Sequence, residues 1–292
     1  MASLALEAPK PVSPTWRNFR EALRRHPTAV AGGLVLLVMI LVAILAPWLG
    51  TVDPEAVAPV KRLRGPSAQF WFGSDMMGRD VYSRVLYGAR VSLTVGIAVA
   101  LLSTLVGLAI GLTTGFVRWL DAIVMRVMDG LMSIPPVLLA IALMALTHAS
   151  MQNVIVAITL AEAPRVVRLV RSLVLTLRDE PYVMAAVAAG TRLPRILWRH
   201  ILPNIVAPLL VQATYVCASA MITEAILSFI GAGTPPNIPS WGNIMAEARS
   251  MFQIAGYLIL FPGICLSLTV LAVNLLGDGL RDALDPRLAR RM

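Results

Sequence analysis

The sequence predicts an all-α membrane protein with six transmembrane helices. Hydrophobic residues make up 58% of the 292 residues and charged residues 14%, whereas soluble domains average about 45–50% and about 25%. The mean hydropathy is +0.76. Several uncharged stretches reach the roughly 20 residues that cross a bilayer. A soluble enzyme, a disordered chain and a fibrous repeat are therefore poor interpretations, because none of them could bury this much apolar surface.

The six expected spans follow from the uncharged runs and from one polar interruption. Residues 130–161 carry no charge but are too long for a single span, and the polar stretch 147–153 divides them. The dipeptides Pro135-Pro136 and Pro262-Gly263 should kink the third and sixth spans. The expected spans lie near 29–49, 91–117, 124–146, from 153 onward, 205–230 and 252–277.

The distribution of basic residues predicts that both termini lie in the cytoplasm. Six spans place the termini on one side, and 18 of the 25 Lys and Arg residues then fall on that side. Cytoplasmic connections are the ones that carry excess Lys and Arg. The expected parts are a tail with an interfacial helix at 1–28, the first span and an external segment at 29–90, a five-helix core at 91–280 containing a long cytoplasmic loop at 178–204, and a tail at 281–292.

Signals for catalysis or metal binding are missing from the sequence. Neither lysine lies in a Gly-x-x-x-x-Gly-Lys-Ser/Thr loop, so the chain cannot build a P-loop. No histidine lies in a His-Glu-x-x-His pattern, and no Gly-x-Ser-x-Gly elbow occurs. Cys217 and Cys265 lie in apolar runs, where we expect them to pack as small hydrophobes. We expect no catalytic residue, no metal site and no cofactor bound by this chain.

The loop 178–204 has a pattern of its own. A short helix should begin near Pro181, which suits a first helical turn, and end at Gly190, which suits a helix stop. Small residues cover much of its surface, so another protein could approach closely. The basic, amphipathic stretch 192–204 that follows is either a docking element or an interfacial helix lying on anionic lipid.

This loop resembles the EAA loop of binding-protein-dependent ABC importer permeases. In that family the loop forms the coupling helix that sits in a cleft of a cytoplasmic ATPase. Met184 stands where the family usually has Glu, and methionine carries no charge that could form an ion pair from that position. The resemblance rests on Met184, Ala185, Ala186, Gly190, Ile201, Leu202 and Pro203.

Four further stretches are similar to one branch of that family, the C-type permease of dipeptide, oligopeptide and nickel importers. They occur in order along the chain and on the predicted sides of the membrane, which makes the resemblance specific. It covers about residues 25–287. The stretches are 72–93, 224–231, 239–242 and 274–287.

The resemblance implies a type I ABC importer permease fold in the bacterial cytoplasmic (inner) membrane. The implied partners are a second permease subunit, two ATP-binding-cassette ATPase subunits that bind ATP and Mg, an external solute-binding protein and membrane lipid, with no nucleic acid. Di- or oligopeptides are the expected solutes, and glutathione-like peptides and nickel are alternatives. A stand-alone secondary transporter is an alternative from another class, but it would not explain the small-residue loop. An intramembrane enzyme is a further alternative, but the sequence has no nucleophile–base or metal pattern to support it.

Charged residues inside the expected spans are costly and therefore informative. Glu162 and Arg165 could form an i, i+3 pair or line the translocation path. Arg168 and Arg171 continue the three-residue spacing, and we expect them to snorkel at a helix end. Glu224 faces the path or caps a neighbouring helix.

Two more clusters leave alternatives open. Small residues at four-residue spacing line one face of the second span, where they allow close helix approach either to a partner permease or within the subunit; they are Ser103, Gly107, Gly111 and Gly115. In the external segment, charged residues could contact a binding protein or pair within the segment; they are Asp75, Arg79 and Asp80.

Overall fold

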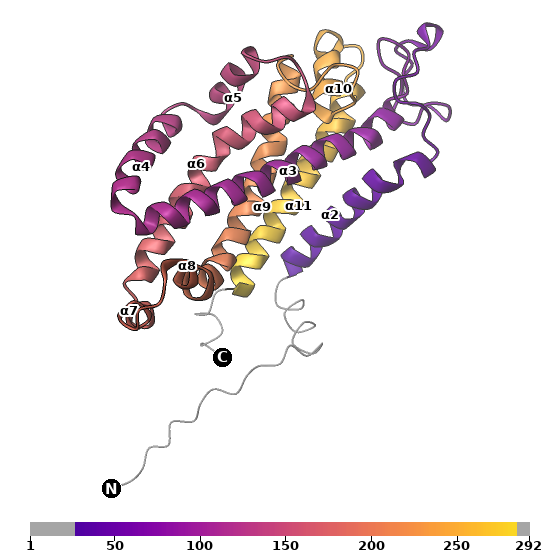
Figure 1. The fold of residues 1–292 in the computed structure, drawn as a ribbon. Coiled ribbons are helices and arrows are strands. Elements are labelled where there is room, and N and C mark those ends of the chain that lie inside the picture. Colours follow the sequence, from indigo (N-terminus) through magenta and orange to yellow (C-terminus); the bar gives the residue numbers. More distant parts are fainter. Residues whose placement is uncertain (1–26, 285–292) are drawn as a thin grey trace, which may run out of the picture.

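The computed structural model describes residues 27–284 as an elongated bundle of helices (Figure 1). Residues 1–26, with the expected interfacial helix, and 285–292, most of the expected C-terminal tail, lie outside the described residues. Within the described part the long helices are α2 (Pro27–Leu45), α3 (Val81–Phe116), α6 (Met151–Arg178), α9 (Leu202–Phe229) and α11 (Tyr257–Leu284). The shorter ones are α4 (Arg118–Met132), α5 (Pro136–Ala145), α7 (Pro181–Ala188), α8 (Leu193–Ile196) and α10 (Trp241–Glu247).

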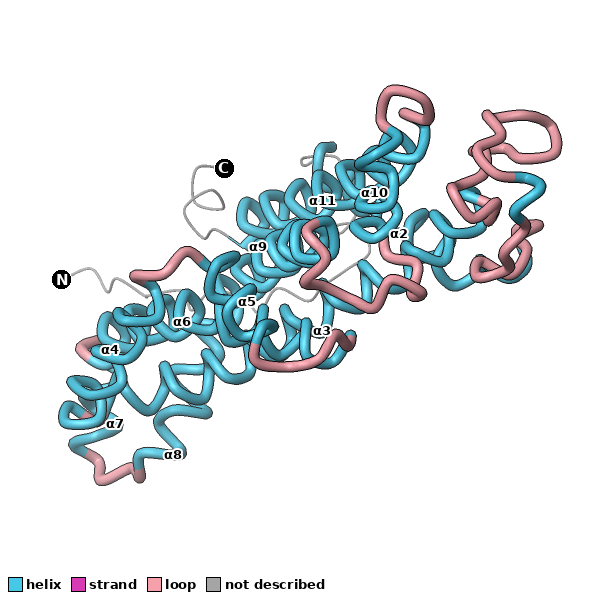
Figure 2. Tube along the Cα trace, turned by 90° about the horizontal axis from the view of Figure 1, so that it is seen from above, coloured by secondary structure: helices cyan, strands magenta, loops and turns pink. Residues whose placement is uncertain are grey.

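The two ends of the bundle carry different segments. The short helices α7 and α8 lie at one end, and α10 lies toward the other (Figures 1 and 2). Seen from above, the described path is mostly helical, with the longest loops before α3 and α10 (Figure 2). The loop between α6 and α9 and the expected external segment therefore occupy opposite ends of the molecule.

Local sequence explains where three helices begin. The Asp80 carboxylate accepts a hydrogen bond from the Ser83 backbone N–H at 2.8 Å and caps α3. The hydroxyl of Ser150 caps α6 in the same way, and that of Ser240 caps α10. Each cap satisfies a backbone N–H that has no partner inside its own helix.

Four helices are long and apolar enough to cross a membrane: Pro27–Trp48, Val81–Phe116, Leu193–Phe229 and Tyr257–Ala283. A fifth span results if α4 and α5 count together. The helix α6, which covers the expected fourth span, is not among them, since it carries Glu162 and four arginines. The mostly helical architecture with four or five candidate spans is therefore confirmed, whereas a count of six is not.

The bounds of the second and third spans differ from those expected. The expected external segment 50–90 ends at residue 80, because the capped helix α3 begins ten residues before the apolar run. The expected single span 124–146 is two helices that meet at 90°. Residues 118–121, between the expected second and third spans, form the first turn of α4. Tandem prolines account for the break, since the residue before a proline disfavours helical backbone.

Only one of the two expected proline kinks becomes a break. Pro135 precedes α5, and Pro136 occupies its first turn. By contrast, α11 continues through Pro262, which lies in its second turn.

Buried apolar side chains form two clusters that share α3 and α9. One cluster fills the space among α3, α5, α6 and α9 and extends to Val183 and Ile196 in the α7–α8 loop. The other joins α2, α3, α9, α10 and α11 around Trp241, whose indole N–H donates to the Val85 carbonyl at 3.0 Å. Because α3 and α9 belong to both clusters, they join the two parts of the apolar core.

Candidate functional site

The short helix expected in the long loop is α7, and its end shows why a glycine stands there. The Gly190 N–H donates to the Val187 carbonyl at 2.9 Å, and the Thr191 N–H donates to the Ala186 carbonyl at 3.0 Å. This is the Schellman arrangement, which needs a left-handed residue after the helix. Gly190 supplies it with φ +75°. The left-handed backbone conformation of Gly190 therefore ends α7.

One side of α7 is anchored and the other is exposed. Val183 is fully buried in the same apolar cluster as Val174 and Ile205, which belong to α6 and α9. Met184 and Val187 are 54% and 55% exposed, and Ala185 next to them is also exposed. The helix is thus held by one deep side chain and presents a small apolar surface.

The rest of the loop joins α7 to α9. Ile201 is buried at the end of a π-helical turn (Leu197–Ile201), Leu202 is half-buried, and Pro203 is exposed in the first turn of α9. The Asn204 amide donates to the His200 carbonyl at 2.7 Å and to the Tyr182 hydroxyl at 3.3 Å.

The phenol of Tyr182 is therefore the polar link between α7 and α9. Partial burial, and then the Glu180 carboxylate, raise the pKa of this phenol above its ordinary value. Displacement of α7 can thus pass to α9 through this contact and through the shared apolar cluster.

The small-residue stripe of α3 packs against α6 of the same chain. A Cβ atom added to Gly107 would lie 2.5 Å from Val166 Cβ, and one added to Gly111 would lie 2.6 Å from Val170 Cβ. Gly115 meets Val174 in the same way, and Ser103 is buried at the start of the stripe. Each glycine of the stripe thus packs against one valine of α6. The backbone of α3 is therefore in direct contact with side chains of α6, the helix that precedes α7.

The arginines of α6 form ion pairs with α4, which the sequence alone did not indicate. Arg168 lies 2.6 Å from the Asp129 carboxylate, and Arg171 makes a two-pronged pair with Asp121. We expected these arginines to snorkel. They instead form ion pairs with two acids of α4 that are eight residues apart. These ion pairs hold α4, the first helix of the α4–α5 pair, against α6.

Glu162 is a buried carboxylate with two partners. One oxygen lies 3.3 Å from the Arg165 guanidinium, and the other accepts from the Ser219 hydroxyl of α9 at 2.9 Å. The side chain of Glu162 is 1% exposed and that of Arg165 is 34% exposed. The two residues form the expected i, i+3 pair, with the acid directed inward.

Glu224 is fully buried among hydroxyl groups. Its carboxylate accepts from Ser228 at 2.8 Å and lies 3.5 Å from the Ser92 hydroxyl of α3. Ser228 and Ser240 both contact the Thr234 hydroxyl, so the network continues toward α10. The carboxylate therefore joins α3, α9 and the segment before α10.

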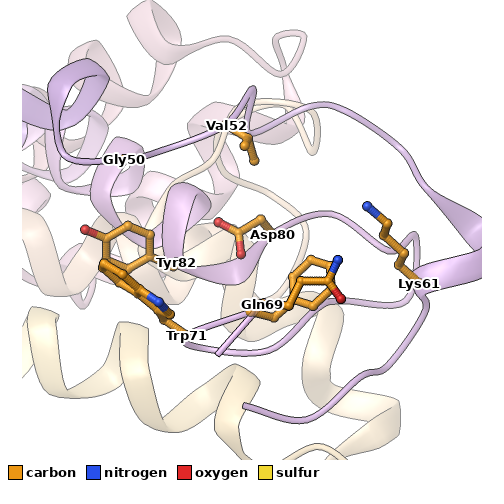
Figure 3. A pocket seen from close by; sticks show the side chains of 8 residues that line it. Gly50, Val52, Lys61, Gln69, Trp71, Asp80 and Tyr82 are labelled. Atoms are coloured by element: carbon orange, nitrogen blue, oxygen red, sulfur yellow. The ribbon is translucent and has the colours of Figure 1, made fainter. Parts of the chain in front are cut away.

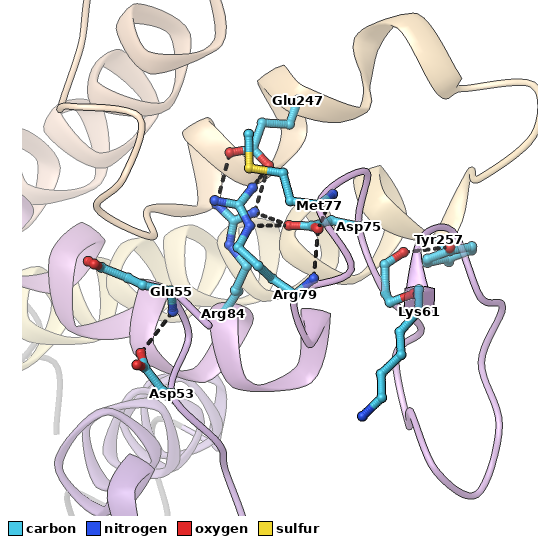
Figure 4. Close-up of polar contacts among 10 residues, drawn as sticks. Asp53, Glu55, Lys61, Asp75, Met77, Arg79, Arg84, Glu247 and Tyr257 are labelled. Atoms are coloured by element: carbon cyan, nitrogen blue, oxygen red, sulfur yellow. Dashed lines mark hydrogen bonds and ion pairs between the residues drawn. The ribbon is translucent and has the colours of Figure 1, made fainter. Parts of the chain in front are cut away.

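The expected external segment is fixed by four charged groups (Figure 4). Asp75 lies 2.6 Å from both Arg79 and Arg84. Glu247 of α10 lies 2.5 Å from Arg79 and 2.6 Å from Arg84. The cluster has two acids and two bases, and Arg84 is 1% exposed. The expected pairing of Asp75 with Arg79 is present, whereas Asp80 caps α3 and takes no part.

Arg84 and Glu247 were missed by the sequence reasoning. Asp75 and Arg79 are four residues apart and can be paired by inspection, but Glu247 lies 163 positions beyond Arg84. Only the fold brings α10 over the start of α3. Among the described residues, no group of three or more His, Cys, Asp or Glu side chains could hold a metal ion.

Comparison with known proteins places these features in a family. Residues 103–290 match the family described as binding-protein-dependent transport system inner membrane component. Residues 14–66 match the N-terminal transmembrane domain of oligopeptide transport permease C.

Similar proteins are known from several bacteria. A probable peptide ABC transporter permease of Sinorhizobium fredii is 57% identical over 92% of each chain. A dipeptide transport system permease of Alkalihalophilus pseudofirmus is 42% identical over 95% of this chain and 91% of the other. A glutathione transport system permease of Pectobacterium atrosepticum is 43% identical over 99% of this chain and 96% of the other.

A solved structure shares the fold. A chain of the methionine ABC transporter MetNI, in an inward-facing conformation, has a TM-score of 0.56 and 19% identity. The match covers 69% of this chain and 96% of that chain. At this identity the likeness shows the fold alone.

Proposed function

The chain belongs to the family of binding-protein-dependent transport system inner membrane components, and from this premise we propose that it forms half of the transmembrane path of a peptide-importing ABC transporter. Its relatives named for peptide, dipeptide and glutathione transport match more than nine-tenths of its length. These names support peptides as the solute class over nickel. The other half of the path would come from a second permease subunit.

In the proposed assembly, two ATPase subunits bind ATP and Mg on the cytoplasmic side and an external solute-binding protein delivers the peptide. The chain would cross the bacterial inner membrane six times, with the α4–α5 pair as the third span and α6 as the fourth. Its pairing of Arg168 and Arg171 with α4 supports α6 as a spanning helix, since paired charges cost less to bury.

The single observation that carries the coupling role is the form of α7. It is held by buried Val183, ends at a left-handed glycine, and presents Met184, Ala185 and Val187 at the tip of the molecule. A small apolar surface on a rigid helix suits insertion into a cleft of another protein. Met184 at the position of the family's usual Glu makes this contact apolar rather than ionic.

Motion of α7 would reach the membrane through α6 and α9. The end of α6 is held by Arg178, which donates to the Gly115 carbonyl of α3 at 3.0 Å. Closure of the ATPase dimer would shift α7, and the packed helices would follow as a rigid unit because their interdigitated contacts resist gradual deformation. The chain thus transmits displacement, and the chemistry of hydrolysis belongs to the partner subunits.

The test is a tagged purification from membranes that express the native operon. We expect a second permease and ATPase subunits to co-elute, with ATPase activity in the eluate. Replacement of Ala185 by Trp should remove the ATPase subunits while the chain and its permease partner remain. Ala56→Trp, an exposed alanine in the external segment, is the matched control and should leave the complex intact.

Two outcomes would contradict the proposal. Undiminished ATPase co-elution with Ala185→Trp would remove α7 as the docking helix. Elution of the chain alone, with solute uptake that needs no ATP, would indicate a stand-alone secondary transporter. Uptake of a labelled dipeptide by cells, competed by glutathione or by nickel, would then define the solute class.

A further inference from the structure

A pocket of about 350 Å³ lies in the external segment, away from the α7 loop (Figure 3). It opens between the end of the first span and the start of α3. Three aromatic rings, one ammonium group and one carboxylate line it. They belong to Phe70, Trp71, Tyr82, Lys61 and Asp80.

The carboxylate in this pocket has a free oxygen. Asp80 Oδ2 accepts both hydrogen bonds from Ser83, which cap α3. Its Oδ1 atom has no hydrogen-bond partner among residues 27–284. Figure 3 shows the Asp80 carboxylate between the Trp71–Tyr82 pair on one side and Lys61 on the other.

The ammonium group is equally unpaired. Lys61 forms no ion pair within the described part of the chain, and its nitrogen lies 5.7 Å from the centre of the Phe70 ring. The indole of Trp71 and the phenol of Tyr82 meet edge to face at 4.8 Å and form a wall beside Asp80. Two opposite charges therefore face one pocket without neutralising each other.

We propose that this pocket is a subsite for the two charged ends of a small zwitterionic peptide. The peptide's ammonium group would lie against Asp80 Oδ1 and the ring faces of Trp71 and Tyr82, where a carboxylate and aromatic rings both attract cations. Its carboxylate would bind the Lys61 ammonium. A volume at the lower end of ligand pockets, which span about 300–1,000 Å³, suits a dipeptide better than a segment of protein.

This inference rests on the proposed function, because it assumes peptide on the external side. The external segment would hold a peptide released from the binding protein before it enters the path. The ion cluster of Asp75, Arg79, Arg84 and Glu247 fixes the neighbouring backbone, so the pocket is pre-organised.

The experiment measures binding to the full chain, purified in lipid nanodiscs with whatever subunits accompany it. Radiolabelled L-alanyl-L-alanine is the probe, without ATP and without a solute-binding protein. N-acetyl-dialanine and dialanine amide serve as competitors, each lacking one charge. We expect each blocked peptide to compete about tenfold more weakly than dialanine, in line with the loss of one charge-assisted hydrogen bond.

Two variants test the two ends separately. Asp80→Asn keeps a residue that caps helices well but removes the charge, and it should abolish the discrimination against N-acetyl-dialanine only. Lys61→Gln should abolish the discrimination against the amide only. The matched controls Glu55→Gln and Arg62→Gln remove the same charges from exposed neighbours outside the pocket and should change neither preference.

The subsite proposal would be overturned if the parent chain showed no preference for dialanine over the blocked peptides. It would also be overturned if both preferences survived in both variants. The readout separates this inference from the proposed function. ATPase co-elution with unaltered preferences in the variants would refute only the subsite. The expected preferences in a chain that elutes without ATPase subunits would refute only the proposed assembly.

Discussion

Packing of α3 against α6 can be tested by placing one methyl group at Gly111. An added Cβ would lie 2.6 Å from Val170 Cβ, 2.8 Å from its Cγ1 and 3.0 Å from the Val167 carbonyl oxygen. All three distances are shorter than ordinary van der Waals contact. The carbonyl belongs to the backbone of α6, so the helices must separate or tilt to admit Ala at this position.

Two opposing terms set the expected magnitude. Overpacking a close-packed contact costs about 1–3 kcal/mol, whereas Gly→Ala inside a helix gains up to about 1 kcal/mol in helix propensity. Gly111→Ala should therefore be net destabilising by about 1–2 kcal/mol. Val170→Ala removes Cγ1, one of the three contacting atoms, and leaves Cβ and the Val167 carbonyl in place. The double variant should therefore recover part of the loss, with a coupling energy of about 1 kcal/mol.

The assay is the apparent melting temperature of the full chain in detergent, in a double-mutant cycle of the two positions. At about 2–4 °C per kcal/mol, the expected shifts are measurable. Gly130→Ala is the control, because nothing lies within 4 Å of a Cβ added there. It should be neutral or stabilising and additive with Val170→Ala. Equal melting of Gly111→Ala and the parent chain, or strict additivity with Val170→Ala, would refute the close contact.

Three further substitutions test other parts of the molecule. Glu247→Gln removes one of the carboxylate charges that neutralise the buried Arg84 guanidinium. The free energy of unfolding should fall by about 3 kcal/mol, measured as a lower melting temperature. Exchanging the charges of Asp121 and Arg171 should restore most of the roughly 0.5–1 kcal/mol that either single reversal costs, measured in the same assay. Gly190→Ala forces a side chain into positive φ and should cost about 1 kcal/mol and lower the ATPase activity that co-purifies with the chain.

Each of these predictions has a control and a contrary result. Glu55→Gln removes an exposed charge and should leave the melting temperature unchanged; an equal effect at Glu247 would mean that the cluster is unimportant. If the variant with both charges exchanged melts no higher than either single reversal, a direct ion pair between α4 and α6 is excluded. Gly190→Asn should be tolerated better than Gly190→Ala, because asparagine adopts left-handed backbone more readily, and the reverse order would contradict the Schellman stop.

The sequence predicted the helical elements well where a local pattern was enough. Uncharged runs located the ends of α2 and α9 to within four residues and those of α11 to within seven, since a bilayer-length apolar run has few alternatives to a helix. Pro181 and Gly190 located α7 because they act on their own backbone. The start of α3 was misplaced because the expectation followed hydropathy, while the Asp80 cap begins the helix earlier.

Composition and local pattern by themselves determined the membrane class, most helix positions and the loop that we propose for coupling. Tertiary structure alone decided which residues meet: valines of α6 over glycines of α3, Asp121 with Arg171, and Glu247 with Arg84. It also decided the angle of 90° between α4 and α5, whereas the position of that break follows from Pro135 and Pro136. The physical reason is range. Hydropathy, caps and turns act within a few residues, whereas ion pairs and packing join positions whose separation along the chain carries no information about their distance in space.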